Sequence, residues 1–196
     1  MTTSREPSVP DGVDITRPGI GRVFDYLLDG KDKFAADRAV TEKLTASNLE
    51  PNRLALVTRD FLIRAVGFAA RSGVAQFLDL GSGLPASPSV HEIARQVIPD
   101  ARVVYVDNDP VVIARNRALL ATGDGIVTIQ ADVREPGRTG TTARPSGSAR
   151  APRFSAFSTV SRVEPGLVAM QDWRPAETTD RSPLQATNLS GVAVLR

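Results

Sequence analysis

The feature that most constrains the fold of this chain is a change in hydrophobic period after residue 75. Three short apolar runs, 76–80, 102–107 and 126–131, are typical of strands, and helical patterns over 89–99 and 110–121 separate them. Strand, helix, strand, helix and strand at this spacing is the alternation of a parallel α/β sheet. The sequence therefore predicts an open parallel sheet.

Three helices are expected before the first strand. Apolar residues recur at helical spacing over 17–30, where Gly30 supplies a C-terminal stop. A weaker helix is expected over 34–46 and a longer one over 51–72, which opens with a proline and is closed by Gly73. The parallel sheet is thus preceded by a helical N-terminal block.

The first strand leads into a turn that contains two glycines. Asp79 lies near the end of this strand, and Gly81 and Gly83 lie in the turn after it. Ligands of open α/β sheets bind at this edge, and glycine lets a ligand approach the backbone closely. Taken alone, the same pattern is also typical of an ordinary tight turn.

Two further acidic residues follow the next two strands. Asp107 ends the second strand, 26 residues after Gly81, where an acid can accept hydrogen bonds from both ribose hydroxyls of an adenosine. Asp109 precedes Pro110 and is better explained as a helix cap. Asp132 follows the third strand. Taken by itself it is best interpreted as an acidic loop residue that faces water, but a carboxylate at this strand end can also accept a hydrogen bond from the amine of an adenine. The three acids together predict an adenosine pocket.

The position at which the next helix starts distinguishes between two classes of adenosine cofactor. Gly81, Gly83 and Ala86 match the dinucleotide pattern G-x-G-x-x-G/A, which needs a helix to begin within the motif and meet a pyrophosphate. Here two prolines intervene, and Ser89 and Glu92 form a capping box that delays the helix. The longer loop suits a ligand with an amino-acid tail and no pyrophosphate, which is S-adenosylmethionine.

Composition excludes several kinds of site. The chain has no cysteine, which excludes disulfides, thiolate zinc sites, iron–sulfur clusters and cysteine nucleophiles. Its one histidine, His91, lies in the first turn of a helix, which favours a structural role over that of a base, and we expect no metal site. No apolar run approaches the ~20 residues of a spanning helix, and the N-terminus lacks the apolar core of a signal peptide. We therefore expect a cytoplasmic protein without a membrane partner.

The basic character of the chain is confined to one tract. The isoelectric point is about 9.4, yet residues 138–162 hold five arginines and no acid, while the whole chain has a net charge of +2. Segment 137–162 is rich in Ser, Thr, Ala, Gly and Pro and is too poor in large apolar residues to offset its ordering entropy, so we expect it to be disordered. Nucleic-acid binding is a weak alternative for this tract, because it lacks aromatic stacking partners in a basic groove.

A run of motifs in order makes the sequence resemble a known family. From about Asp14 to Pro136 it is similar to the actinobacterial S-adenosylmethionine-dependent methyltransferases once catalogued as a domain of unknown function. The motifs that carry the resemblance are, in chain order, R-V-F-D-Y-L-L at 22–28, G-K-D at 30–32, A-D-R at 36–38, F-L-D-L-G-S-G-L-P at 77–85, V-H-E at 90–92, V-Y-V-D-N-D-P at 104–110 and A-D-V-R at 131–134.

The resemblance implies an α/β, class I (Rossmann-like) methyltransferase fold. It implies a helical lid over 14–73 and an S-adenosylmethionine-binding half over 74–136, with no catalytic residue assigned. The residues implied at the cofactor are Asp79, Gly81 and Gly83 for the methionine part, Asp107 for the ribose and Asp132 for the adenine. Ser82, Asn108 and Val133 are implied as further cofactor contacts, together with Arg22 and Tyr26 in the lid. Asp25 and Asp32 are further candidate contacts of the lid.

The resemblance stops at about Pro136. The family would continue through a fourth strand, a helix, a fifth strand and a helix before a C-terminal hairpin, but here the tract 137–162 stands in their place. Residues 163–196 are similar to the remnant of that hairpin, and residues 1–13 are expected to form a disordered leader. An incomplete sheet without its fourth and fifth strands would expose an edge of the first strand, unless the hairpin pairs there.

The expected function is methyl transfer from S-adenosylmethionine to a small-molecule acceptor whose identity does not follow from the sequence, nor does the oligomeric state. The alternative is a truncated, catalytically inactive remnant that binds the cofactor. An NAD-binding protein and a nucleic-acid-binding protein are less favoured.

Overall fold

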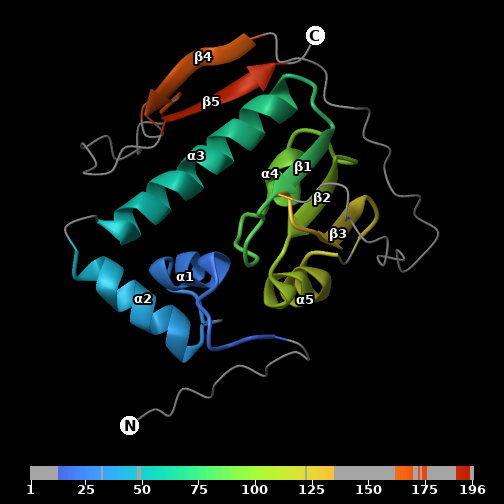
Figure 1. Cartoon of the computed structure of the whole chain (residues 1–196). Coiled ribbons are helices and arrows are strands. Elements are labelled where there is room, and N and C mark those ends of the chain that lie inside the picture. Colours follow the sequence, from blue (N-terminus) through green and yellow to red (C-terminus); the bar gives the residue numbers. More distant parts are fainter. Residues whose placement is uncertain are drawn as a thin grey trace.

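The computed structural model describes residues 13–31, 33–47, 50–121, 123–134, 162–169, 172, 174–175 and 189–194. The elements are α1 (Ile20–Leu27), α2 (Ala35–Thr45), α3 (Pro51–Arg71), β1 (Gln76–Leu80), α4 (Val90–Arg95), β2 (Arg102–Asp107), α5 (Pro110–Leu119), β3 (Ile126–Gln130), β4 (Arg162–Ala169) and β5 (Leu189–Val194) (Figure 1). The leader expected over 1–13 and the tract over 137–162 lie outside the described residues, apart from one residue at the end of each. In the described part of the chain, no helix combines the length and apolar character that crossing a membrane requires.

The predicted parallel α/β core is confirmed. Strands β1, β2 and β3 form one parallel sheet in that order. The register places Asp79 beside Tyr105, and Asp107 beside Gln130. Because the strands are parallel, their carboxyl ends lie along one edge of the sheet, which we call the site edge.

The ends of some helices differ from the predicted ones. Helix α4 ends at Arg95 rather than near residue 99. Gly30 is not the left-handed residue after α1: Asp29 has a φ of 64°, and the Gly30 N–H donates to the Asp25 carbonyl over 2.7 Å. Aspartate is one of the few residues besides glycine that visit this conformation, so the chain turns one residue earlier than predicted.

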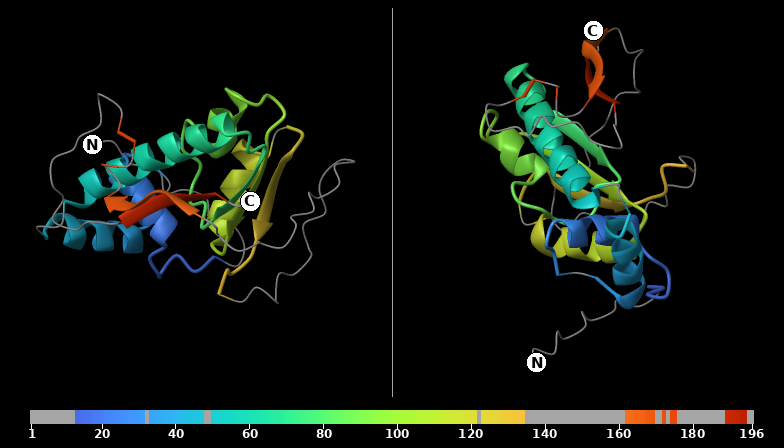
Figure 2. Two further views of the ribbon diagram at one scale, coloured as in Figure 1. Left: turned by 90° about the horizontal axis from the view of Figure 1, so that it is seen from above. Right: turned by 90° about the vertical axis from the view of Figure 1, so that its left-hand side faces the viewer.

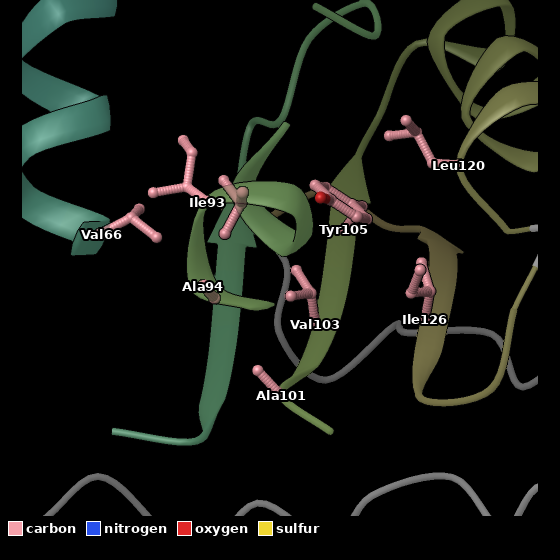
Figure 3. Close-up of a cluster of buried hydrophobic side chains, with 9 residues drawn as sticks. Val66, Ile93, Ala94, Ala101, Val103, Tyr105, Leu120 and Ile126 are labelled. Atoms are coloured by element: carbon pink, nitrogen blue, oxygen red, sulfur yellow. The ribbon is translucent and has the colours of Figure 1, made fainter. Parts of the chain in front are cut away.

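The main core lies between the sheet and the helices α3 and α4. Val103 and Tyr105 of β2 lie opposite Val66 of α3 and Ile93 of α4 (Figure 3). Figure 2 shows both helices against the same face of the sheet. All four side chains are buried, so this cluster fixes β2, and with it the strand end that carries Asp107.

The sheet is incomplete, as predicted. Strands β4 and β5 pair with each other in an antiparallel sheet of their own. Among the described strands β1 pairs only with β2, so the hairpin does not cover the free edge of β1. Leu80, at the end of this edge strand, is 53% exposed.

Helix α4 begins with the predicted capping box. The Ser89 Oγ accepts the Glu92 N–H, and the Ser89 N–H donates to the Glu92 carboxylate over 2.6 Å. This backbone hydrogen bond holds the pKa of Glu92 below its usual value. The cap fixes where the helix starts, and therefore how long the loop after β1 is.

We expect Ser89→Ala to lower the free energy of unfolding by about 1 kcal/mol, because the substitution leaves an N-terminal N–H of α4 without its acceptor. Urea denaturation checks this. Ser72→Ala is the control: it removes an exposed serine at the end of α3 and should cost less than about 0.5 kcal/mol. Equal losses in the two variants would contradict a capping role for Ser89.

Candidate functional site

The glycine turn after β1 presents open backbone at the site edge. Gly81 and Gly83 have φ values of 70° and 66°, in the left-handed region that favours glycine. The N–H groups of Gly81 and Ser82 both donate to the Val106 carbonyl, over 2.8 and 3.1 Å, which ties the turn to β2. A Cβ added at Gly81 would meet no heavy atom within 4 Å, so the space beside this residue can admit a ligand.

Asp107 holds the other side of this turn. Its Oδ2 accepts the Gly83 N–H over 2.9 Å, and its Oδ1 accepts the Asp109 N–H over 2.9 Å. A carboxylate has about four lone-pair positions, so about two of them are left for further donors. The structure thus places an oriented carboxylate next to the glycine turn, where the sequence predicts the ribose.

Asp79 is a half-buried acid one residue before the end of β1. Burial raises the pKa of Asp79 to about 6, an effect that Arg59 of α3 opposes and the carboxylate of Asp107 increases. The group is therefore mostly ionised at neutral pH, but at an energetic cost. Such a carboxylate favours a cationic partner, and the ammonium group of an amino-acid tail is one.

The residues after β3 lie in a more open part of the site edge. The Asp132 carboxylate accepts the backbone N–H and the guanidinium of Arg134, and these hydrogen bonds lower the pKa of Asp132 to about 2. Val133 is 56% exposed. Asn108 is also exposed, and its carbonyl accepts a hydrogen bond from the Gln130 amide over 3.4 Å. The predicted adenine side is thus accessible, with its carboxylate paired to an arginine.

Helix α1 of the predicted lid packs directly on the glycine turn. A Cβ added at Gly21 would lie 3.3 Å from the Gly83 Cα and 3.3 Å from a methyl group of Val112 in α5. Figures 1 and 2 show α1 beside α5. Only glycine at position 21 permits this approach without displacing backbone, so α1 and the turn form one packed unit.

Arg22 of α1 is buried in an ion-pair network that sequence reasoning missed. Its Nε donates to Asp37 over 2.9 Å, its Nη1 donates to Asp109, and its Nη2 donates to the Arg17 carbonyl over 2.9 Å. The Arg22 side chain is 4% exposed. Asp109 also accepts the Val111 N–H over 2.8 Å and caps α5, as predicted. The partners lie 15 and 87 residues away along the chain, so no local pattern could have paired them.

Tyr26 lies at a groove in the N-terminal block. It lines an open groove of about 430 Å³ between the N-terminal helices, and Lys33 Nζ sits 3.6 Å from the centre of its ring. The other residues that line this groove are Asp29, Thr41, Glu42, Thr45, Ala46 and Asn52. None of these belongs to the site edge, so the groove that Tyr26 lines does not include Asp79, Asp107 or Asp132. Asp32 lies outside the described residues.

His91 and Arg59 support the loop between the turn and α4. The His91 Nδ1 lies 2.9 Å from the Tyr105 hydroxyl and 3.0 Å from the Ser89 Oγ, and burial lowers the pKa of His91. These contacts fit the structural role expected for the only histidine. Arg59, which no sequence motif singled out, donates through Nη2 to the carbonyls of Ala86 and Pro88 and so ties α3 to the loop.

Comparisons with known proteins agree with this geometry. The family model described as S-adenosyl methyltransferase matches residues 6–146, which include every element from α1 to β3. The structure is similar to that of a "putative methyltransferase" from Thermobifida fusca YX, with 48% identity, a TM-score of 0.60, and coverage of 65% of this chain and 48% of that one. It is also similar to a DUF574 family protein from Streptomyces avermitilis, with 38% identity, a TM-score of 0.59, and coverage of 63% and 48%. No curated protein matches the chain.

The matched regions define how far the likeness extends. This chain spans about half the length of the solved structures that it matches. The family match nevertheless takes in the glycine turn, Asp107 and the N-terminal helices α1, α2 and α3, and it covers well over half of the residues. The resemblance predicted from the motifs is confirmed, and the chain belongs to the S-adenosyl methyltransferase family.

Proposed function

We propose that the carboxyl ends of β1, β2 and β3 bind S-adenosylmethionine and that the chain transfers its methyl group to a small-molecule acceptor in the cytoplasm. The observation that carries the proposal is the contact between Asp107 and Gly83. Here an oriented carboxylate, with acceptor positions to spare, adjoins a left-handed glycine turn and open space. An adenosine with a short amino-acid tail matches that combination.

The residues present fit the parts of this cofactor. Gly81 and Gly83 would let the methionine part approach the backbone, and the Asp79 carboxylate suits its ammonium group. Asp107 would accept the ribose hydroxyls, and Asp132 would accept the adenine amine beside Arg134. The residues of the site edge, with α1 packed against the glycine turn, would provide these contacts in the order in which the cofactor presents its groups.

The chemistry that bound S-adenosylmethionine supplies is an electrophilic methyl group on a sulfonium. The task of the chain is then to bind, orient and exclude water, because alignment of an acceptor with the methyl group contributes most of the rate. We assign no general base. The His91 Nδ1 is already engaged by Tyr105 and Ser89, which argues for a structural role.

A binding remnant without turnover is the second candidate. It is favoured by β1, which is an edge strand among the described strands. In this case the half that holds the cofactor persists, and the walls that would position an acceptor do not.

Calorimetric titration of the full chain with S-adenosylhomocysteine and, separately, with NAD tests the cofactor class. We expect saturable binding of S-adenosylhomocysteine and none of NAD, because the loop after β1 places no helix N-terminus at a pyrophosphate. At a ligand concentration of 100 times Kd, binding should raise the free energy of unfolding by about 2.7 kcal/mol.

The other outcomes assign the chain differently. Binding of NAD alone would contradict the proposal and favour a dinucleotide site. Binding of neither ligand, with steeply salt-dependent binding of a labelled oligonucleotide, would favour a nucleic-acid role. Binding of S-adenosylhomocysteine without transfer of a labelled methyl group to any component of a pooled metabolite extract would identify the remnant.

A further inference from the structure

We infer that Arg22 is a positioning residue, which couples the docking of α1 to the orientation of Asp107 and Gly83, and not a direct contact of the cofactor. The inference deepens the proposed function and rests on it for the identity of the ligand. Its geometric part, the link between α1 and the glycine turn, concerns the ligand-free chain.

The first step is that all three nitrogens of the Arg22 guanidinium donate hydrogen bonds inside the protein. It donates to three acceptors from three separate segments, namely Asp37, Asp109 and the Arg17 carbonyl. The Phe34 ring, itself 2% exposed, covers it with a centroid 5.4 Å from the Arg22 Cζ. With its side chain 4% exposed and its nitrogens held by these acceptors, the guanidinium is oriented toward the protein interior.

The second step is that the network continues to the glycine turn. Arg22 holds the Asp109 carboxylate, and the Asp109 backbone N–H donates to the Asp107 Oδ1 over 2.9 Å. The other oxygen, Asp107 Oδ2, accepts the Gly83 N–H over 2.9 Å. Both oxygens of the predicted ribose acceptor are thus oriented by backbone N–H groups, one from Gly83 in the turn and one from Asp109, the partner of Arg22.

The third step is that α1 touches the turn by a second route. Gly21, the neighbour of Arg22, packs against the Gly83 backbone. The start of α1 is tied down as well, because the Gly19 N–H donates to Asp37 over 2.9 Å. Movement of α1 would therefore disturb Gly83 directly and Asp107 through Asp109.

These contacts give the ion pair between Arg22 and Asp109 a role beyond its contribution to stability. Buried ion pairs contribute little net stability when compared with apolar packing, and their best-attested use is to specify one arrangement. If the pair specifies the docked position of α1, binding at Asp107 and docking of α1 must favour each other to the same extent. Loss of the ion pair between Arg22 and Asp109 should then weaken ligand binding. Bound ligand should in turn slow amide hydrogen exchange in α1.

Conservative variants test this coupling without emptying the buried site. Arg22→Lys keeps the charge but lacks the planar fork of donors that spans the two carboxylates, and Asp109→Asn keeps an oxygen to cap α5 while removing the charge. The matched control is Arg17→Ala, whose side chain is 87% exposed and whose carbonyl stays in place. For each chain we would measure amide hydrogen exchange of α1 and Gly83 without ligand, and the Kd for S-adenosylhomocysteine.

We expect both conservative variants to weaken S-adenosylhomocysteine binding about tenfold, within the range of about 5–150-fold typical of coupled sites. Exchange at α1 and at the Gly83 amide should rise together, by about tenfold. The double variant should lose about the same factor as each single one, because the two substitutions break one pair. Arg17→Ala should leave both measurements unchanged.

Three results would overturn the inference. Faster exchange of α1 with an unchanged Gly83 amide would break the link to the turn, whatever the ligand result. Weaker binding with unchanged exchange would make Arg22 a direct contact, and faster exchange with unchanged Kd would make the pair structural only. If the unmodified chain binds no S-adenosylhomocysteine, the proposed function fails, and the exchange of Gly83 still decides whether Arg22 orients the turn.

Discussion

Asp107→Asn should weaken S-adenosylhomocysteine binding by about 100-fold. A hydrogen bond to a charged group contributes about 1.5–3 kcal/mol, and the asparagine loses the charge and one of the two acceptor oxygens that would face the ribose. A loss of about 3 kcal/mol corresponds to about two powers of ten in Kd. Isothermal titration of the two chains measures the change.

Asp100→Asn is the matched control for this substitution. Asp100 is an exposed acid just before the amino end of β2, at the edge of the sheet opposite to Asp107. The same charge is removed next to the same strand, so an effect on net charge alone would appear in both variants. We expect less than a twofold change in Kd for Asp100→Asn.

The role of the ribose can be tested on the ligand side as well. Adenosine should bind the unmodified chain more tightly than 2′,3′-dideoxyadenosine does, and Asp107→Asn should bind the two with similar affinity. This pattern assigns the hydroxyls to Asp107, because removing either partner of the interaction abolishes the effect of removing the other. An undiminished preference for adenosine in the variant would place the hydroxyls elsewhere.

Asp79→Asn should stabilise the ligand-free chain at neutral pH and not at pH 4. Burial raises the pKa of Asp79 from its ordinary value of 3.8 to about 6. Between these values the folded state binds a proton that the unfolded state does not, so the free energy of unfolding falls as pH rises through this window. The full shift corresponds to about 3 kcal/mol, and asparagine removes this cost because it has no charge to bury.

Urea denaturation of both chains at pH 4 and pH 7.5 measures this difference. Other groups act in the opposite direction: burial lowers the pKa of His91, and hydrogen bonds to Ser89 lower that of Glu92, so both disfavour the folded state as pH falls. They are common to the two chains, so the difference between the chains isolates Asp79. A difference that stays constant between the two pH values would contradict the prediction.

The elements of this protein could be predicted because their signals are local. The change from helical to strand periodicity marks the start of β1, and the capping residues Ser89 and Asp109 mark the starts of α4 and α5. Each signal depends on neighbours within a turn of helix or a few residues of strand. The parallel topology then brings the ends of β1, β2 and β3 together, so Asp79 and Asp107 could be predicted at one edge.

Helix α1 shows where local signals are insufficient. The residues around Arg22 and Tyr26 carry the family resemblance, but the sequence cannot tell which of their side chains faces the sheet. In the structure Arg22 turns inward to two carboxylates and Tyr26 lines a separate groove. That choice depends on how α1 docks on α2 and α5, which is a property of packing and not of helical period.

By itself, then, the sequence determined the α/β alternation, the helix caps, the glycine turn and the family. Only the tertiary structure decided that Asp107 is oriented by Gly83 and Asp109, that Arg22 links α2 to α5, and that β1 has no described strand along its outer edge. The physical reason is the range of the interactions. Periodicity and caps are set within a few residues, whereas a buried charge finds its partners only when segments up to 87 residues apart pack together.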